Sequence, residues 1–174
     1  KTWAVAGTVG YGDSVFGVDD LIFSASLTAG LKVSRDGGAT FEAFGPTLSF
    51  ELIASIVQLG DEYVFATNQG VWAKNTEGEW EKTFNKTGSF TNLASVDGTL
   101  YGLNGSVSIV DGAIVGSANI YASADTGKTW VEVEVVSEIK PIYGDHNKVV
   151  EVGGKLYATA IQKSNPLVSS DGGV

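Results

Sequence analysis

Aromatic side chains lie beside acidic or amide side chains at four places in this 174-residue sequence. Aromatic rings stack on the apolar faces of sugars and hold apolar side chains, while carboxylates and amides bind hydroxyl and peptide groups. If the fold brings the four places together, they predict a binding site for a carbohydrate or a protein. The alternative is that these rings fill the core. The candidate residues are Tyr11, Asp13, Phe50, Glu51, Phe90, Asn92, Tyr143, Asp145 and His146.

No set of residues points to catalysis. His146 is the only histidine, and we interpret it as a solvated loop residue rather than a base or a metal ligand. Most carboxylates lie in turns, although two of them could still serve a glycosidase. We predict no catalytic residue, no metal-ligand set and no cofactor, and leave open a structural Ca²⁺ or Na⁺ ion near Asp145.

The charge balance excludes one class of partner. The chain has 20 acidic against 11 basic residues, a net charge of −9 and no basic cluster, so we do not expect it to bind nucleic acid. It has no cysteine, which removes disulfide and thiolate chemistry. No apolar run reaches the roughly 18 residues of a membrane span. Because Lys1 is not an initiator methionine, we expect a processed chain or a piece of a longer one.

An eight-residue turn motif organises the chain and must position the candidate residues. In Ser123–Trp130, Asp125 can accept backbone N–H bonds and Gly127 can adopt a positive φ. Trp130 then opens the next strand. Ser34–Phe41 has serine, aspartate, glycine, threonine and an aromatic residue at the same places. The motif therefore predicts a repeated β-turn with a structural role.

Two further copies of the motif are incomplete. Ala73–Trp80 has Asn75 in place of the aspartate, and Ser169–Gly173 is the front half of a copy. The four copies start at positions 34, 73, 123 and 169, which are 39, 50 and 46 residues apart. This period is typical of propeller blades of four short strands rather than of helical solenoids.

The sequence therefore predicts an all-β fold, a single β-propeller domain of about four four-stranded antiparallel blades. The blades would cover approximately residues 7–45, 46–87, 88–138, and 139–174 plus 1–6. Lys1–Trp3 matches the back half of the motif, so we expect Thr2–Ala6 to close the last blade; alternatively, the chain is cut from a longer array. The candidate binding residues would gather at one end of the central channel. The first strands are expected at Ser14–Val18, Leu52–Leu59, Phe90–Val96 and Lys148–Val152.

A longer segment interrupts the third blade between Leu103 and Asn119. At its centre, Asp111-Gly112 is flanked by β-branched residues, which is a strong signal for a two-residue hairpin turn. Residues 107–115 either fold onto their own blade or form an apolar arm that pairs with another chain.

The repeated turn resembles the Asp box of the BNR, sialidase-type β-propellers, commonly written S-x-D-x-G-x-x-W with threonine before the aromatic residue. Two good copies, one degenerate copy and one split copy span nearly the whole chain. The resemblance implies that each box forms the turn between the third and fourth strands of a blade, away from the central channel. The box residues are Ser34, Asp36, Gly38, Phe41, Asn75, Trp80, Ser123, Asp125, Gly127, Trp130 and Asp171.

The resemblance does not fix an activity, because Asp boxes occur in enzymes and in other proteins. Sialidases use three arginines to bind a carboxylate, and this chain has only Arg35, inside a box. We predict a non-catalytic recognition or scaffold module for a carbohydrate or protein, outside the cytoplasm as a secreted, periplasmic or cell-surface protein. One alternative is a glycoside hydrolase or a fragment of one. The other is a structural or designed repeat piece that self-assembles through the split blade or the 107–115 hairpin instead of remaining a monomer.

Overall fold

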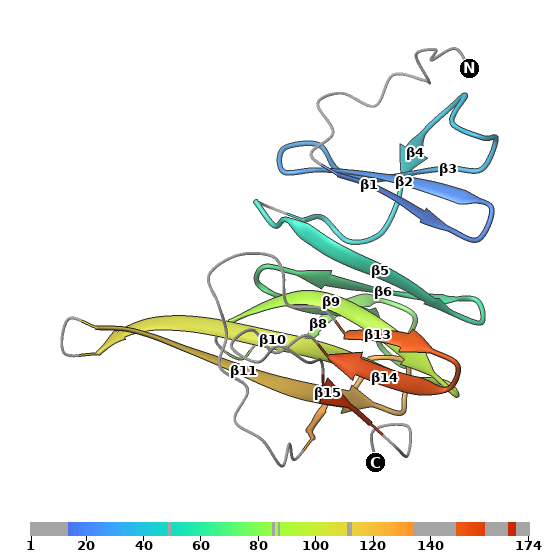
Figure 1. The fold of residues 1–174 in the computed structure, drawn as a ribbon. Coiled ribbons are helices and arrows are strands. Elements are labelled where there is room, and N and C mark those ends of the chain that lie inside the picture. Colours follow the sequence, from blue (N-terminus) through green and yellow to red (C-terminus); the bar gives the residue numbers. More distant parts are fainter. Residues whose placement is uncertain are drawn as a thin grey trace, which may run out of the picture. The chain divides into compact units, whose positions relative to one another are not determined.

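The computed structural model describes residues 14–48, 50–84, 86, 88–110, 113–133, 149–158 and 167–169. The regular structure of these residues consists of β-strands (Figure 1). Within them, no helix has the length and apolar character needed to cross a membrane. The chain divides into two compact units, Lys1–Ile53 and Ala54–Val174.

The first unit contains one antiparallel sheet, the first sheet, whose strands follow each other in chain order. Phe23 and Val33 are paired across two of its strands and are 0% and 1% exposed. The ring of Phe44 lies edge-on to Phe23, with centroids 5.3 Å apart. Burial of this apolar face stabilises the sheet. The strands are β1 (Ser14–Val18), β2 (Leu21–Ser26), β3 (Gly30–Ser34) and β4 (Glu42–Ala43).

The second unit contains three antiparallel sheets, each built from strands that are neighbours in sequence. The second sheet comprises β5 (Ile53–Leu59), β6 (Glu62–Thr67), β7 (Gly70–Lys74) and β8 (Trp80–Phe84). The third sheet comprises β9 (Ser89–Val96), β10 (Thr99–Val110), β11 (Ala113–Ser123) and β12 (Val131–Glu132). The fourth sheet comprises β13 (Val149–Val152), β14 (Lys155–Ala158) and β15 (Leu167–Val168).

These sheets confirm the predicted all-β fold with repeated antiparallel sheets. The predicted first strand of the first blade coincides with β1, and those of the other blades match β5, β9 and β13 to within one residue. Three sheets have four strands, and the fourth has three among the described residues. The predicted closing strand, Thr2–Ala6, lies outside the described residues.

The second and third sheets pack face to face through one hydrophobic cluster. The rings of Phe84 and Phe90 meet edge to face there, with centroids 4.6 Å apart. Every buried member of the cluster is at most 4% exposed, so its removal from water is a main source of stability. The second sheet contributes Val64, Ala66, Val71, Ala73 and Phe84, and the third contributes Phe90, Leu93, Leu100 and Tyr121.

The third and fourth sheets pack through a second cluster, on the opposite face of the third sheet. A hydrogen bond supports this contact, because the backbone N–H of Val149 donates to Oδ1 of Asn92 at 2.7 Å. The third sheet is therefore covered on both faces. Its contribution is Ala94, Val96, Tyr101 and Leu103, and that of the fourth sheet is Val149, Leu156 and Ala158.

The hairpin formed by β10 and β11 is much longer than the strands beside it. Its strands pair with each other as far as Val110 and Ala113, whereas β9 pairs with β10 only as far as Gly105. Among the described residues, the far half of the hairpin has no strand at either edge (Figure 1). The hairpin thus extends as an arm, and its pairing with another chain stays a prediction.

Candidate binding site

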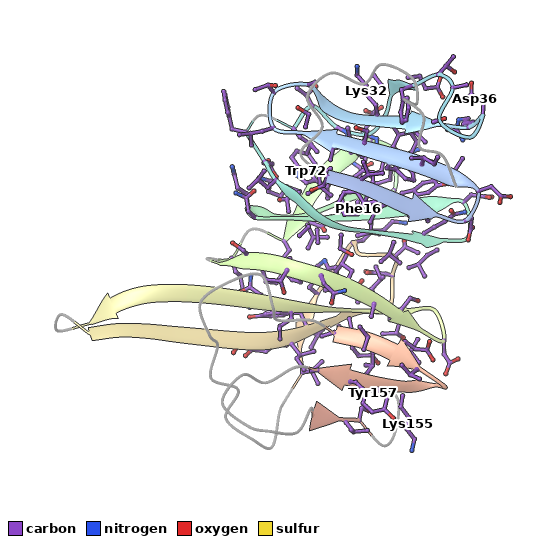
Figure 2. The ribbon with its side chains drawn as sticks, turned by 45° about the horizontal axis from the view of Figure 1, so that its top comes forward. Phe16, Lys32, Asp36, Trp72, Lys155 and Tyr157 are labelled. Atoms are coloured by element: carbon purple, nitrogen blue, oxygen red, sulfur yellow. The ribbon has the colours of Figure 1, made fainter. Side chains whose placement is uncertain are left out.

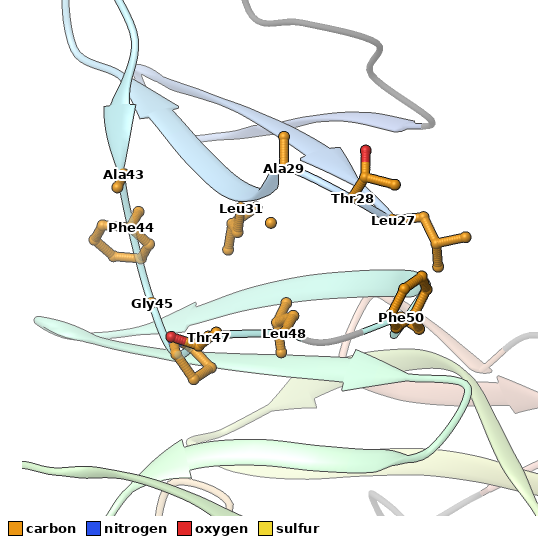
Figure 3. A pocket seen from close by; sticks show the side chains of 12 residues that line it. Leu27, Thr28, Ala29, Leu31, Ala43, Phe44, Gly45, Thr47, Leu48 and Phe50 are labelled. Carbon is orange, nitrogen blue, oxygen red and sulfur yellow. The ribbon is translucent and has the colours of Figure 1, made fainter.

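A cavity of about 430 Å³ lies within the first unit, between the turn that joins β2 to β3 and the segment that follows β3 up to residue 50. Figure 3 shows Phe50 at one end, Phe44 at the other, and Leu31 and Leu48 between them. Leu31 and Leu48 are 3% and 5% exposed, so they form a buried apolar floor. The lining residues are Leu27, Thr28, Ala29, Gly30, Leu31, Ala43, Phe44, Gly45, Pro46, Thr47, Leu48 and Phe50.

Local hydrogen bonds set the walls of this cavity. In the turn between β2 and β3, the Ser26 hydroxyl accepts the backbone N–H groups of Thr28 and Ala29, both at 3.4 Å. Serine commonly stabilises turns in this way. The backbone N–H of Phe44 donates to the carbonyl of Leu31 at 2.9 Å. This bond fixes the start of the 44–50 segment to β3.

Phe50 has an unusual backbone conformation and an exposed ring. Its φ is +57°, in the left-handed region that bulky residues rarely adopt, at a cost of about 1–3 kcal/mol. The side chain is 70% exposed, so burial of the ring does not offset this cost. Strained backbone with an exposed aromatic ring is typical of a contact surface.

The cavity lining is chemically uniform. Of its described side chains none is charged, and the only hydroxyl groups belong to Thr28 and Thr47. Apart from the two threonine hydroxyls, the described lining offers no side chain of the kinds that act as a general acid, a general base or a nucleophile. It can hold an aliphatic or aromatic group, with the threonine hydroxyls available to a neighbouring polar atom.

The binding residues predicted from sequence do not all lie in this cavity. Phe50 lines it, and the adjacent Glu51 is buried at 7% exposure. The prediction that Phe90 binds a ligand is wrong. Its ring is 1% exposed within the cluster between the second and third sheets, so it packs in the core and cannot stack on a ligand. Phe90 lies on a strand covered on both faces, where an aromatic residue serves packing.

Asn92 also has a structural environment. Its Oδ1 accepts the backbone N–H of Val149, and its Nδ2 donates to the carbonyl of Leu93 at 3.1 Å. The amide thus connects β9 to the first strand of the fourth sheet. The remaining predicted binding residues, Tyr11, Asp13, Tyr143, Asp145 and His146, lie outside the described residues.

The turn Ser34–Phe41 is closed by side-chain bonds. The Ser34 hydroxyl donates to Asp36 at 2.8 Å and accepts the backbone N–H of Gly38 at 2.8 Å. Asp36 also accepts the backbone N–H of Thr40 at 2.9 Å and its hydroxyl at 2.6 Å. These bonds, with the Thr40 hydroxyl the largest influence, lower the pKa of Asp36 from 3.8 to about 2.

The turn Ser123–Trp130 has the same bonds at nearly the same lengths. The Ser123 hydroxyl donates to Asp125 at 2.8 Å and accepts the N–H of Gly127 at 2.9 Å. Asp125 accepts the N–H and hydroxyl of Thr129 at 2.8 and 2.6 Å. Partial burial acts to raise the pKa of Asp125, but the bonds from Thr129 and Ser123 outweigh it, and the pKa is lowered.

The second of these turns is also attached to the second sheet. The indole Nε1 of Trp130 and the hydroxyl of Thr83 both donate to the carbonyl of Gly127, at 3.0 and 2.5 Å. A Cβ added to Gly127 would lie 3.0 Å from a methyl group of Val64, so the backbone of the turn rests directly on β6. The turn therefore joins two sheets.

The degenerate copy keeps part of the bonding. Oδ1 of Asn75 accepts the backbone N–H groups of Glu77 and Glu79, both at 3.0 Å, so the amide oxygen takes the place of a carboxylate oxygen. Trp80 stacks on Phe65 with centroids 4.8 Å apart.

Of the remaining box residues, Phe41 is half-buried, and Asp171 lies outside the described residues. In the described parts of the chain, no group of three His, Cys, Asp or Glu side chains is placed to hold a metal ion.

Sequence reasoning missed most of the cavity, including Phe44, Pro46 and Leu48. Two signals were available. Residues 43–50 form a run without a charged side chain, and Gly45-Pro46 interrupts it with a turn signal. Which apolar residues of such a run point inward depends on tertiary contacts, and period-2 alternation does not apply outside strands.

Among known proteins, only solved structures are similar to this chain. No family model matches the sequence, and no curated protein matches it. The solved structures similar to the chain include YCF48 bound to a D1 peptide, with 15% identity and a TM-score of 0.55 over 96% of this chain and 58% of that chain. They also include Bacteroides ovatus xyloglucan PUL GH43B, with 12% identity and a TM-score of 0.48 over 83% of this chain and 34% of that chain. YCF48 from Cyanidioschyzon merolae has 10% identity and a TM-score of 0.35, over 86% of this chain and 66% of that chain.

The first of these likenesses shows the fold: the chain has the β-propeller fold. The chain spans 58% of the length of that YCF48 chain.

Proposed function

We propose that this β-propeller is a non-catalytic recognition module of the Asp-box type and that its ligand is a protein segment. The cavity of the first unit holds an apolar side chain of that segment, and the exposed ring of Phe50 covers this bound side chain. The uncharged lining of the cavity is the observation that carries the proposal.

The chemistry of the lining favours a protein over a carbohydrate. Sugar recognition uses several polar side chains, and glycoside hydrolysis uses two carboxyl groups. The lining offers aliphatic and aromatic side chains with two threonine hydroxyls. An apolar side chain that covers the exposed ring of Phe50 gains roughly 25 cal/mol per Å² of apolar surface buried.

Two further observations support the proposal. The similar YCF48 structure contains a bound D1 peptide, which agrees with a protein segment as ligand. The matching bonds of the turns at Asp36 and Asp125 support the Asp-box assignment. We include in the proposal a location outside the cytoplasm, which fractionation of the producing cells tests.

The proposal can be tested by selecting a phage-displayed random peptide library on the purified chain. We expect enriched peptides to share an aliphatic or aromatic residue and to bind in solution by isothermal titration. Phe50→Ala should weaken that binding by about tenfold or more, as expected for a truncated aromatic anchor. Val131→Ala is the matched control, because Val131 is equally exposed at 69% and lies in the other unit.

Several outcomes would overturn the proposal. One is equal binding by the wild type and Phe50→Ala. Another is the absence of enriched peptides together with binding on a glycan array, which would favour a carbohydrate ligand. Hydrolysis of aryl glycosides by the purified chain would favour a glycoside hydrolase.

A further inference from the structure

One edge of the first sheet is formed by β4, the last strand in the order β1-β2-β3-β4. Both of its residues, Glu42 and Ala43, are exposed. An edge strand presents backbone N–H and C=O groups that have no partner in their own sheet, and such groups can pair with an extended segment of another protein. This edge therefore offers a second kind of contact, made by the backbone, beside the apolar contact of the cavity.

The pairing of β3 with β4 shows which backbone groups face this edge. Ala43 lies opposite Lys32 of β3, which is labelled in Figure 2. The next residue, Phe44, donates its N–H to the carbonyl of Leu31, so these two residues form a hydrogen-bonded pair. In an antiparallel ladder, hydrogen-bonded pairs alternate with pairs that are not hydrogen-bonded. The N–H and C=O of Ala43 therefore point away from β3, toward the open edge.

This edge continues into the cavity of the first unit. Ala43, Phe44 and Gly45 all line the cavity, so an extended segment that pairs with Ala43 also reaches it. Opposite residues of neighbouring strands share a face of the sheet, and successive residues alternate between faces. Phe44 therefore shares its face with Leu31, another lining residue. On an added strand, the residue next to the one opposite Ala43 places its side chain on this cavity face.

The single charged side chain of β4 leaves the edge accessible. Charged side chains on edge strands commonly discourage pairing with other chains. The carboxylate of Glu42, however, accepts the Nε–H of Arg35 at 3.0 Å, and Arg35 directly follows β3. This ion pair draws the carboxylate back toward β3 and offsets its charge. The other residue of β4, Ala43, has only a methyl group.

We propose that the protein ligand binds as an additional strand on the open edge of β4. One of its residues exchanges two backbone hydrogen bonds with Ala43, and the side chain of a neighbouring residue enters the cavity. The backbone bonds contribute affinity with little dependence on sequence, whereas the cavity selects the side chain. The inference rests on the proposed function, because it states how the protein segment is held.

The first test is an N-methyl scan of a peptide selected from the random library, with the unmodified protein chain. Each peptide amide is methylated in turn, and Kd is measured by isothermal titration. Methylation of the amide that donates to the Ala43 carbonyl should raise Kd by about tenfold or more, because one hydrogen bond is lost and the carbonyl is left unpaired. The sensitive residue should be next to the aliphatic or aromatic residue that the peptides share. Methylation of the amides on either side should have a much smaller effect, since those N–H groups point away from β4.

Hydrogen exchange measured by NMR tests the same contact on the protein. The amide of Ala43 should exchange roughly tenfold or more slowly in the saturated complex than in the free protein, because a bonded amide exchanges only when the bond opens. Glu132 is the matched control in the other unit. Val133 donates its N–H to Ile120, so the amide of Glu132 faces the open edge of β12 in the same way. Its exchange rate should not change on binding.

A substitution at Ala43 separates the N–H from the side chain. Ala43→Pro removes the outward N–H but no bond to β3, a position that tolerates proline, and should raise Kd by about tenfold. Ala43→Gly keeps the N–H and should bind like the wild type. Far-UV circular dichroism identifies a variant that fails to fold. The methylation and exchange experiments then decide, because both use the unmodified chain.

The outcomes distinguish this inference from the proposed function. If Phe50→Ala weakens peptide binding while the Ala43 amide exchanges at an unchanged rate, the cavity binds the peptide but β4 does not, and only the inference is overturned. A methyl scan with equal effects at neighbouring amides would also overturn it. If no peptide binds, both the proposed function and the inference fail.

Discussion

The turns at Asp36 and Asp125 have the same internal bonds but different surroundings. In each, a buried serine and an aspartate hold the backbone with equivalent bonds that differ by at most 0.1 Å in length. Only the second turn ends in a tryptophan, whose indole N–H bonds the turn carbonyl while its ring contacts the cluster between two sheets. The comparison teaches that the motif closes itself locally, and that its aromatic residue determines how firmly it joins neighbouring sheets.

The largest expected effect is on the aromatic residue. Trp130→Ala should reduce the free energy of unfolding by about 3 kcal/mol, because it removes a ring packed near Phe84 and Phe90 and an N–H donor. Phe41→Ala should cost less, about 1 kcal/mol, since phenylalanine has no such donor. Urea unfolding followed by circular dichroism measures both. Equal losses would show that the attachment at Trp130 contributes little.

The residue after the aspartate gives a reciprocal test of backbone strain. Thr126 has φ +58°, where the other turn has Gly37 at φ +70°. Thr126→Gly should raise the free energy of unfolding by about 1 kcal/mol, since a left-handed conformation costs a residue with a Cβ roughly 1–2 kcal/mol. Gly37→Thr should lower it by a similar amount, because a Cβ there meets no atom within 4 Å and only the backbone is strained. Thermal unfolding measures both changes; a destabilised Thr126→Gly would show that the bond from its hydroxyl to the Asp125 carbonyl outweighs the strain.

The smallest expected effect is the pH dependence of the free energy of unfolding. Both aspartates have a folded-state pKa below the unfolded value, so the unfolded chain binds more protons, and stability falls as pH falls. For Asp36 the contribution is complete above about pH 4 and is lost as pH approaches 2, given its pKa of about 2. Titration of the carboxyl carbon signals by NMR measures both pKa values. In Asp36→Asn this part of the pH dependence should disappear, and a carboxyl that titrates near 3.8 would contradict the bonding described.

The sequence predicted the strands well because the turn signals repeat. Turns such as Gly60-Asp61 and Asp97-Gly98 end strands that mix apolar and small residues, so β1 was expected at its observed limits, and β5 and β9 were expected to within one residue. The Asp111-Gly112 signal predicted a two-residue hairpin, and β10 does pair with β11 as far as Val110 and Ala113. That each strand continues without a break into the blade depends on its pairing partner rather than on local residues.

The binding residues were harder to predict. Phe90 and Phe50 both follow a serine, yet one is 1% exposed and the other 70%. The difference arises from packing between sheets, which joins residues far apart in sequence. The first unit's cavity was missed for the same reason, because Leu31 and Leu48 meet there through the fold and not through any local pattern.

The long hairpin of β10 and β11 has a consequence for the order of folding. Its strands are joined by two residues, so its contacts are close in sequence, and hairpins of this kind form in about 1–10 μs. The bonds between sheets span much longer separations, such as the 44 residues between Thr83 and Gly127 and the 57 between Asn92 and Val149. These must await closure of larger loops, which slows them. We therefore expect the hairpin to form before the second and fourth sheets pack on the third sheet.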